Sequence, residues 1–75
     1  MSTMTKTEKS LAFVSFCIEE YKTRLGADGR KVADMFAKYG VLDYLLTHYD
    51  TLHTLGRDEI LDDIDQFIAA RVVRK

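Results

Sequence analysis

Residues 39–56 decide the fold, and they read Tyr-Gly-Val-Leu-Asp-Tyr-Leu-Leu-Thr-His-Tyr-Asp-Thr-Leu-His-Thr-Leu-Gly. Between the two glycines, apolar side chains recur at helical spacing, at Leu42, Leu45, Leu46, Tyr49 and Leu52. Two amphipathic segments lie upstream of this stretch and one lies downstream. The spacing follows the 3.6-residue period of a helix, and no segment alternates in the manner of a strand. The chain is therefore predicted to be all-α.

Four helices are predicted, at about residues 5–25, 29–39, 41–53 and 57–73. Thr5-Lys6-Thr7-Glu8 fits a capping box at the first helix start, and glycines or Asp28 separate the following helices. An alternative for the third helix is a separate turn over residues 52–55. The helices are expected to form one compact domain over residues 5–75, after a disordered N-terminus at residues 1–4.

The expected core comes from one apolar stripe on each helix. The stripe of the first helix is Leu11, Val14, Cys17, Ile18, Tyr21 and Leu25, widened by Phe13 and Phe16. The stripe of the last helix is Ile60, Leu61, Ile64, Phe67, Ile68 and Val72. A single core in so small a domain supplies little stability, so part of this apolar surface is expected to be covered by another chain.

Composition excludes several classes of function. The chain has 75 residues and a net charge of −1, so no global field attracts nucleic acid or an anionic membrane. The longest apolar run, residues 11–18, is far shorter than the roughly 20 residues that span a bilayer. The single cysteine, Cys17, excludes an intramolecular disulfide and a multi-cysteine zinc site. A lone thiol in an apolar stripe favours a reducing compartment, and we expect a cytoplasmic protein.

His53 is the residue with the most evident chemical potential. Asp50 lies three residues before it and is placed to orient a catalytic base. The structural interpretation, which we favour, is a ring that bonds a carbonyl or a carboxylate and locks the turn at residues 54–56. Cys17 with His53 makes a poor nucleophile and base, because a cysteine inside an apolar stripe is normally a small buried hydrophobe.

The histidines also fail as a metal site. On a continuous helix His48 and His53 point in different directions, unlike the i, i+4 pairs that bind zinc. We therefore expect no catalytic residues, no metal and no cofactor.

Charged residues gather near the start of the last predicted helix. Five acidic side chains occur within eight residues, and no base lies among them; they are Asp58, Glu59, Asp62, Asp63 and Asp65. The simpler interpretation is a solvated helix face. The functional one is an acidic face that meets a basic partner protein.

Residues 32–49 also have the length of a helix-turn-helix, with residues 41–49 as the recognition helix. That interpretation needs basic donors aimed at bases and phosphates, and this segment after Lys38 contains no arginine or lysine. Nucleic-acid binding is therefore the alternative hypothesis.

Self-association as a homodimer is the expected use of the surplus apolar surface. The expected interface is formed by Phe13 and Phe16, with Val72 and Val73 as the second choice.

The chain resembles a family of short bacterial proteins classed only as a domain of unknown function. The resemblance covers about residues 13–68, and its most distinctive string is Tyr-Asp-x-Leu-His-Thr-x-Gly, formed here by Tyr49, Asp50, Leu52, His53, Thr54 and Gly56. It extends to Phe16-Cys17-Ile18-Glu19, Tyr21, Phe36, Lys38-Tyr39-Gly40-Val41-Leu42, Tyr44-Leu45 and Asp63-Ile64. The resemblance implies bacterial origin and a small helical domain, without catalytic residues to carry over.

The resemblance suggests that relatives are encoded beside genes for ADP-ribosyltransferase-like proteins. This gene neighbourhood motivates the hypothesis of a toxin-like partner. The leading hypothesis is a protein-interaction module that acts through an apolar surface, with the acidic face selecting orientation.

Overall fold

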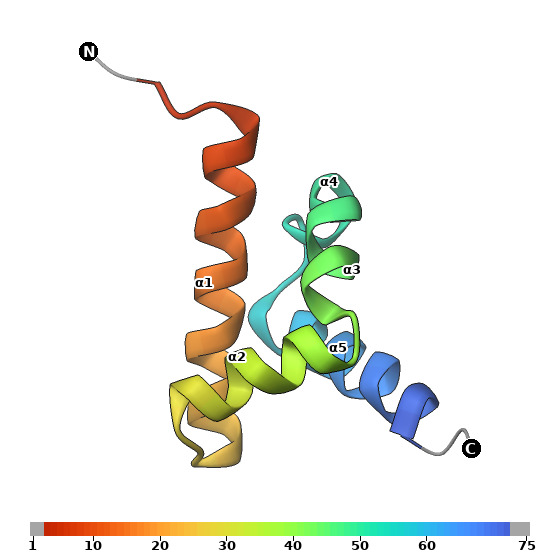
Figure 1. Cartoon of the computed structure of the whole chain (residues 1–75). Helices are drawn as coiled ribbons and strands as arrows, with labels where there is room; N and C mark the ends of the chain where they lie inside the picture. Colours follow the sequence, from red (N-terminus) through yellow and green to blue (C-terminus); the bar gives the residue numbers. More distant parts are fainter. Residues whose placement is uncertain (1–2, 73–75) are drawn as a thin grey trace.

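The computed structural model describes residues 3–72, and these residues form five helices without a strand. The helices are α1 (Lys6–Leu25), α2 (Gly29–Lys38), α3 (Val41–Thr47), α4 (Tyr49–Leu52) and α5 (Arg57–Val72). Figure 1 shows α1 standing beside α3 and α4, with α2 crossing its C-terminal end and α5 running away beneath α3. The all-α prediction is confirmed. Residues 1–2 and 73–75 lie outside the described residues. They include the first half of the predicted disordered N-terminus and the last residue of the fourth predicted helix.

Local signals place the helix ends as predicted. The Thr5 hydroxyl accepts from the Glu8 amide at 3.2 Å while the Glu8 carboxylate accepts from the Thr5 amide at 2.8 Å, which completes the capping box. Gly26 ends α1 in the left-handed region at φ 65°. Asp28 then caps α2 through the Arg30 amide. Each of these ends depends on contacts within four residues, so the sequence alone determines them.

The predicted helix over residues 41–53 is divided at His48. The backbone of His48 leaves helical geometry at φ −106° and ψ 22°, and α4 begins at the next residue. The break directs the Tyr49 ring toward α1, where it meets Phe13 edge-on with 5.5 Å between ring centroids. The break thus accompanies a contact with a helix distant in sequence, and the 3.6-residue period of the segment gives no sign of it.

The core lies where α1, α2, α3 and α5 meet. Within the described part of the chain, thirteen hydrophobic residues are buried: Phe13, Val14, Cys17, Tyr21, Val32, Phe36, Val41, Leu45, Leu52, Ile60, Leu61, Ile64 and Ile68. The α5 stripe is confirmed at Ile60, Leu61, Ile64 and Ile68, with Phe67 half-buried beside it.

The stripe predicted for α1 is partly wrong. Leu11 and Leu25 are 56% and 49% exposed, while Phe13 is buried in their place. The neighbours of α1 cover the side that carries Phe13, Cys17 and Tyr21, so the residues at the edge of the predicted stripe face solvent. Among residues 3–72, no helix has the length and apolar character needed to cross a membrane.

Candidate functional site

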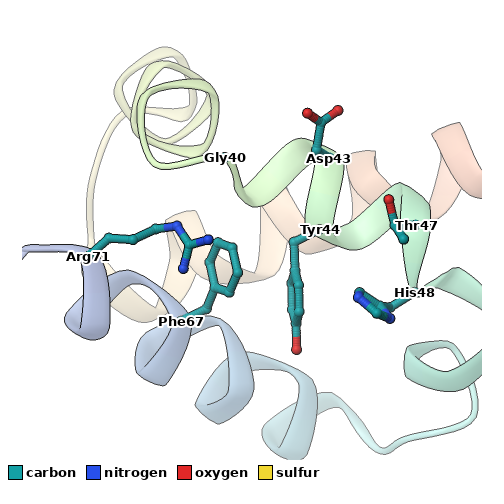
Figure 2. A pocket seen from close by; sticks show the side chains of 7 residues that line it. All are labelled: Gly40, Asp43, Tyr44, Thr47, His48, Phe67 and Arg71. Atoms are coloured by element: carbon teal, nitrogen blue, oxygen red, sulfur yellow. The ribbon is translucent and has the colours of Figure 1, made fainter.

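A hollow of about 520 Å³ lies between α3 and α5 and opens to solvent. The residues that line it come from the α2–α3 junction, from one side of α3 and from the last turns of α5; they are Gly40, Asp43, Tyr44, Thr47, His48, Phe67 and Arg71 (Figure 2). Gly40 adopts φ 76°, a left-handed conformation that suits glycine, and so turns the chain from α2 into α3. This turn brings α3 alongside α5.

Four side chains of the hollow form a continuous stacked row. The guanidinium carbon of Arg71 lies 3.7 Å from the centroid of the Phe67 ring. Phe67 stacks on Tyr44 at 4.2 Å between centroids and an interplanar angle of 24°. Tyr44 contacts the His48 ring at 5.0 Å in a tilted arrangement. The row therefore runs from a cation through two aromatic rings to an imidazole, as Figure 2 shows.

Tyr44 is fixed at its far end by α5. Its hydroxyl donates to Asp63 Oδ2 at 2.5 Å. The hydrogen bond to Asp63, together with burial, raises the pKa of Tyr44 to about 12, so the phenol is a neutral donor near neutral pH. The ring cannot swing out without losing a charge-assisted hydrogen bond, which makes the row a preformed surface.

The charged residues that line the hollow are Arg71 and Asp43. Among residues 3–72, no carboxylate lies within ion-pair distance of the Arg71 guanidinium. Figure 2 shows Asp43 projecting from α3 on the side opposite to Tyr44, away from the stacked row. Stacking on Phe67 uses one face of the guanidinium and leaves its N–H edge for another acceptor.

The acidic residues of α5 mostly contact groups of this chain. Arg24 on α1 pairs with Asp62 at 3.0 Å and with Asp65 at 2.9 Å. Asp65 also accepts from the Tyr21 hydroxyl at 2.5 Å. These bonds tie α5 to α1, as Asp63 ties it to α3 through Tyr44. The acidic run in the sequence predicts a solvated face or a partner face, and its spacing carries no signal for this internal role.

The other two acidic residues lie at the start of α5. Glu59 accepts from the Gly56 amide at 3.1 Å, and Asp58 lies 3.6 Å from the Arg57 guanidinium. Arg57 itself pairs with Glu20 of α1 at 2.8 Å. Asp58, with 80% of its side chain exposed, is therefore the member of the set most available to a partner.

His53 lies on the surface beside α4, and its ring is held by Tyr49. The rings stack at 4.4 Å and an interplanar angle of 10°, and His53 Nδ1 lies 2.8 Å from the Tyr49 carbonyl oxygen. Nδ1 carries the hydrogen in this pairing because a carbonyl only accepts. This ring-to-carbonyl bond is one of the two kinds that the structural interpretation of His53 named, and a structural role for His53 stays a prediction.

The remaining residues of the Tyr-Asp-x-Leu-His-Thr-x-Gly string also make contacts within the chain. Leu52 is buried, and the Thr54 hydroxyl donates to the Thr51 carbonyl at 2.8 Å. Asp50 pairs with Lys6 of α1 at 2.8 Å, a hydrogen bond that lowers the pKa of its carboxyl. The Asp50 carboxylate therefore pairs with Lys6 of α1 and does not hydrogen-bond His53.

Cys17 has no accessible thiol. It is fully buried, and burial raises the pKa of its thiol to about 12, which leaves little thiolate at neutral pH. Among residues 3–72, no three His, Cys, Asp or Glu side chains are grouped to hold a metal ion.

The expected interface residues lie in different environments. Phe13, the first choice, is buried in the core against Tyr49, whereas Phe16 is 41% exposed. Phe13 is therefore not free to contact a second chain. Val72 is half-exposed, and Val73 lies outside the described residues.

The stacked row is not among the sites predicted from the sequence, although part of it has a signal there. Tyr44 with His48 and Phe67 with Arg71 are both i, i+4 pairs, the spacing at which helical side chains touch. The step from Tyr44 to Phe67 joins two helices and has no such signal.

Comparison with known proteins gives a family and no function. No curated protein and no solved structure matches the chain. A model of the family described as protein of unknown function, DUF3791, matches residues 12–71, a span that includes every residue lining the hollow. The match covers well over half of the chain, and the chain therefore belongs to the DUF3791 family of proteins of unknown function.

Proposed function

We propose that this protein is a small bacterial protein-interaction module that binds its partner at the hollow between α3 and α5. The observation that carries the proposal is the stacked row of Arg71, Phe67, Tyr44 and His48. Aromatic residues and arginine dominate the binding energy of protein interfaces, because they offer large rigid surfaces with a polar end. A row already fixed by Asp63 loses little conformational entropy on binding.

The proposal is a binding role without catalysis, metal or cofactor. The one histidine that lines the hollow, His48, packs against Tyr44 in the stacked row, and we assign it to the binding surface. We place the protein in the bacterial cytoplasm, in line with its single buried thiol. A toxin-like or ADP-ribosyltransferase-like protein is the partner that the family resemblance suggests, and Asp58 is the acidic residue left to orient it.

Partner capture with matched variants tests the proposal. Tagged wild-type protein, Arg71→Glu and Arg30→Glu are each immobilised and exposed to extract from the native host. Arg30 is an exposed arginine at the start of α2, so its variant makes the same charge change away from the hollow. We expect a protein retained by the wild type and by Arg30→Glu to be lost with Arg71→Glu. Equal retention by all three would refute a role for the hollow.

Self-association is the second part of the proposal, and the outer face of α1 supports it. Four neighbouring residues on the solvent side of α1 are exposed and uncharged: Leu11, Ala12, Ser15 and Phe16. Leu11 thus takes the place of Phe13 in the predicted interface. A two-fold axis lets one such face cover itself, with the small residues between the large ones.

Sedimentation equilibrium from 10 to 200 µM measures this association directly. We expect the wild type to approach the mass of two chains, and the double variant Leu11→Ser, Phe16→Ser to stay at the mass of one. Val72→Ser tests the second-choice surface and is expected to associate as the wild type does. A single-chain mass for the wild type across the range would refute self-association.

The DNA-binding alternative places α3 in the major groove. The exposed side chains of α3 are Asp43, Leu46 and Thr47, none of which is basic. Phosphate contacts from Arg or Lys supply most non-specific affinity, so α3 offers little to hold a duplex.

A further inference from the structure

We propose that the hollow between α3 and α5 recognises an acidic segment of the partner protein. An aspartate or glutamate carboxylate binds the N–H edge of Arg71, and an adjacent apolar side chain packs on the edges of the Phe67 and Tyr44 rings. This inference rests on the proposed function and adds the chemistry of the partner to it.

Among the described residues, the carboxylates of α5 have partners within the chain, whereas the arginine near its C-terminal end is free to bind another group. The nearby carboxylates are already occupied, Asp62 and Asp65 by Arg24 and Asp63 by the Tyr44 hydroxyl. Arg71, at the far end of the same helix, has no carboxylate partner among residues 3–72. Asp43 also lines the hollow, but its carboxylate projects from α3 away from the stacked row (Figure 2). Beside the stacked row itself, the charge without a complement is therefore the positive charge of Arg71, and a partner supplies the negative one.

The Arg71 guanidinium is held in a fixed orientation. Its guanidinium stacks 3.7 Å from the Phe67 ring centroid, and Phe67 stacks in turn on Tyr44. A stacked guanidinium keeps its plane fixed, and its N–H groups form a fork that matches the two oxygens of a carboxylate. Because the fork is oriented before binding, an acidic side chain gains a paired hydrogen bond without ordering a flexible arginine.

The hollow has room for a short segment of the partner. Its volume of about 520 Å³ accommodates a few side chains, and its opening to solvent admits a continuous segment. Figure 2 shows the Phe67 and Tyr44 rings standing between Arg71 and His48, so an apolar residue next to the acid meets ring edges. The combination selects an acidic residue with an apolar neighbour.

Three blocked peptides of equal length provide the probe: acetyl-Gly-Phe-Asp-Leu-Gly-amide, its Asn version and its Lys version. Each is titrated into the ¹⁵N-labelled full chain, and amide shifts of Tyr44, Thr47, His48 and Arg71 are followed by NMR. We expect the Asp peptide to shift these amides and to bind about tenfold more tightly than the Asn peptide, since an ionic hydrogen bond is lost. The Lys peptide is expected to bind least.

Variants locate the effect. Arg71→Gln is expected to remove the preference for Asp over Asn, while Arg30→Gln is expected to keep it. Phe67→Leu removes the ring on which the Arg71 guanidinium stacks, and it is expected to weaken both peptides, the Asp peptide more than the Asn peptide. Amide shifts far from the hollow report whether each variant is folded. If Arg71→Gln is misfolded, Arg71→Lys replaces it. Lysine keeps the charge without the fork, so this variant should bind the Asp peptide several-fold more weakly.

The outcomes separate this inference from the proposed function. Equal binding of the Asp and Asn peptides, or shifts confined to another face, would overturn the acidic-segment inference. If no peptide binds but Arg71→Glu still loses the native partner, the hollow is a binding site and the partner chemistry is wrong. If the Asp peptide binds as expected and the native partner ignores Arg71→Glu, the recognition chemistry stands and the proposed function fails.

Discussion

Replacing Asp65 by asparagine tests whether the acidic residues of α5 hold the fold together. Asp65 accepts two hydrogen bonds from α1, one from the hydroxyl of the buried Tyr21 at 2.5 Å and one from Arg24 at 2.9 Å. Asp62 provides the matched control, since it bonds the same arginine at 3.0 Å but lacks a tyrosine partner. The two variants make the same chemical change one turn apart on the same helix.

The magnitudes follow from the environments of these bonds. A hydrogen bond to a charged group contributes about 1.5–3 kcal/mol, whereas an exposed ion pair contributes about 0.2–1 kcal/mol. Asparagine still accepts weakly from the tyrosine, so Asp65→Asn is expected to lower the free energy of unfolding by about 1–2 kcal/mol. Asp62→Asn, with an exposed side chain, is expected to cost about 0.5 kcal/mol.

Urea denaturation at pH 7, followed by circular dichroism at 222 nm, gives both numbers if the slope is unchanged. A double-mutant cycle with Tyr21→Phe isolates the phenol bond, because the loss on Asp65→Asn should fall to about that of Asp62→Asn in the phenylalanine background. Equal losses for the two asparagine variants, unchanged by Tyr21→Phe, would show that the phenol bond does not hold α5 to α1.

Three further predictions follow from burial, titration and the chemistry of α3. Ile64→Ala should lower the free energy of unfolding by about 2–4 kcal/mol in urea denaturation, because the Ile64 side chain is fully buried. The control Leu25→Ala, at an exposed site, should cost less than about 0.5 kcal/mol, and an equally small loss for Ile64→Ala would contradict the packing. The pKa of Tyr44 rises from 10.0 to about 12 on folding, so the contribution of Tyr44 to stability is complete below pH 10 and declines toward pH 12. A urea midpoint that does not fall between pH 9 and 11, or that falls equally in Tyr44→Phe, would contradict this prediction. Mixed-sequence duplex DNA at physiological salt should bind no tighter than about 10⁻⁴ M in a fluorescence titration, and a salt-dependent submicromolar complex would revive the helix-turn-helix alternative.

Short-range rules explain which parts of the fold could be predicted. The capping box at Thr5, the left-handed Gly26 and the Asp28 cap depend on residues within one turn, and all are present. The buried stripe of α5 follows from its periodicity in the same way. These features required no knowledge of which helix packs against which.

The incorrect or missing predictions share one cause, a contact between helices far apart in sequence. The break at His48 accompanies the contact of Tyr49 with Phe13, and Leu11 is exposed because the neighbours of α1 cover a different side. The stacked row needs Tyr44 and Phe67 side by side, which only the packing of α3 on α5 provides. Periodicity gives the width of an apolar face but not the direction of its neighbours.

The placement of α5 connects the structural network to the proposed binding site. Asp63 holds the Tyr44 hydroxyl, and Tyr44 supports Phe67, on which Arg71 stacks. Asp63→Asn should therefore weaken peptide binding at the hollow as well as the fold, whereas Asp65→Asn should affect stability alone. This difference separates the carboxylate that shapes the binding surface from the one that only attaches α5 to α1. Within an acidic run that looks uniform in sequence, Asp63 and Asp65 thus take distinct roles, set by the tyrosine that each of them meets.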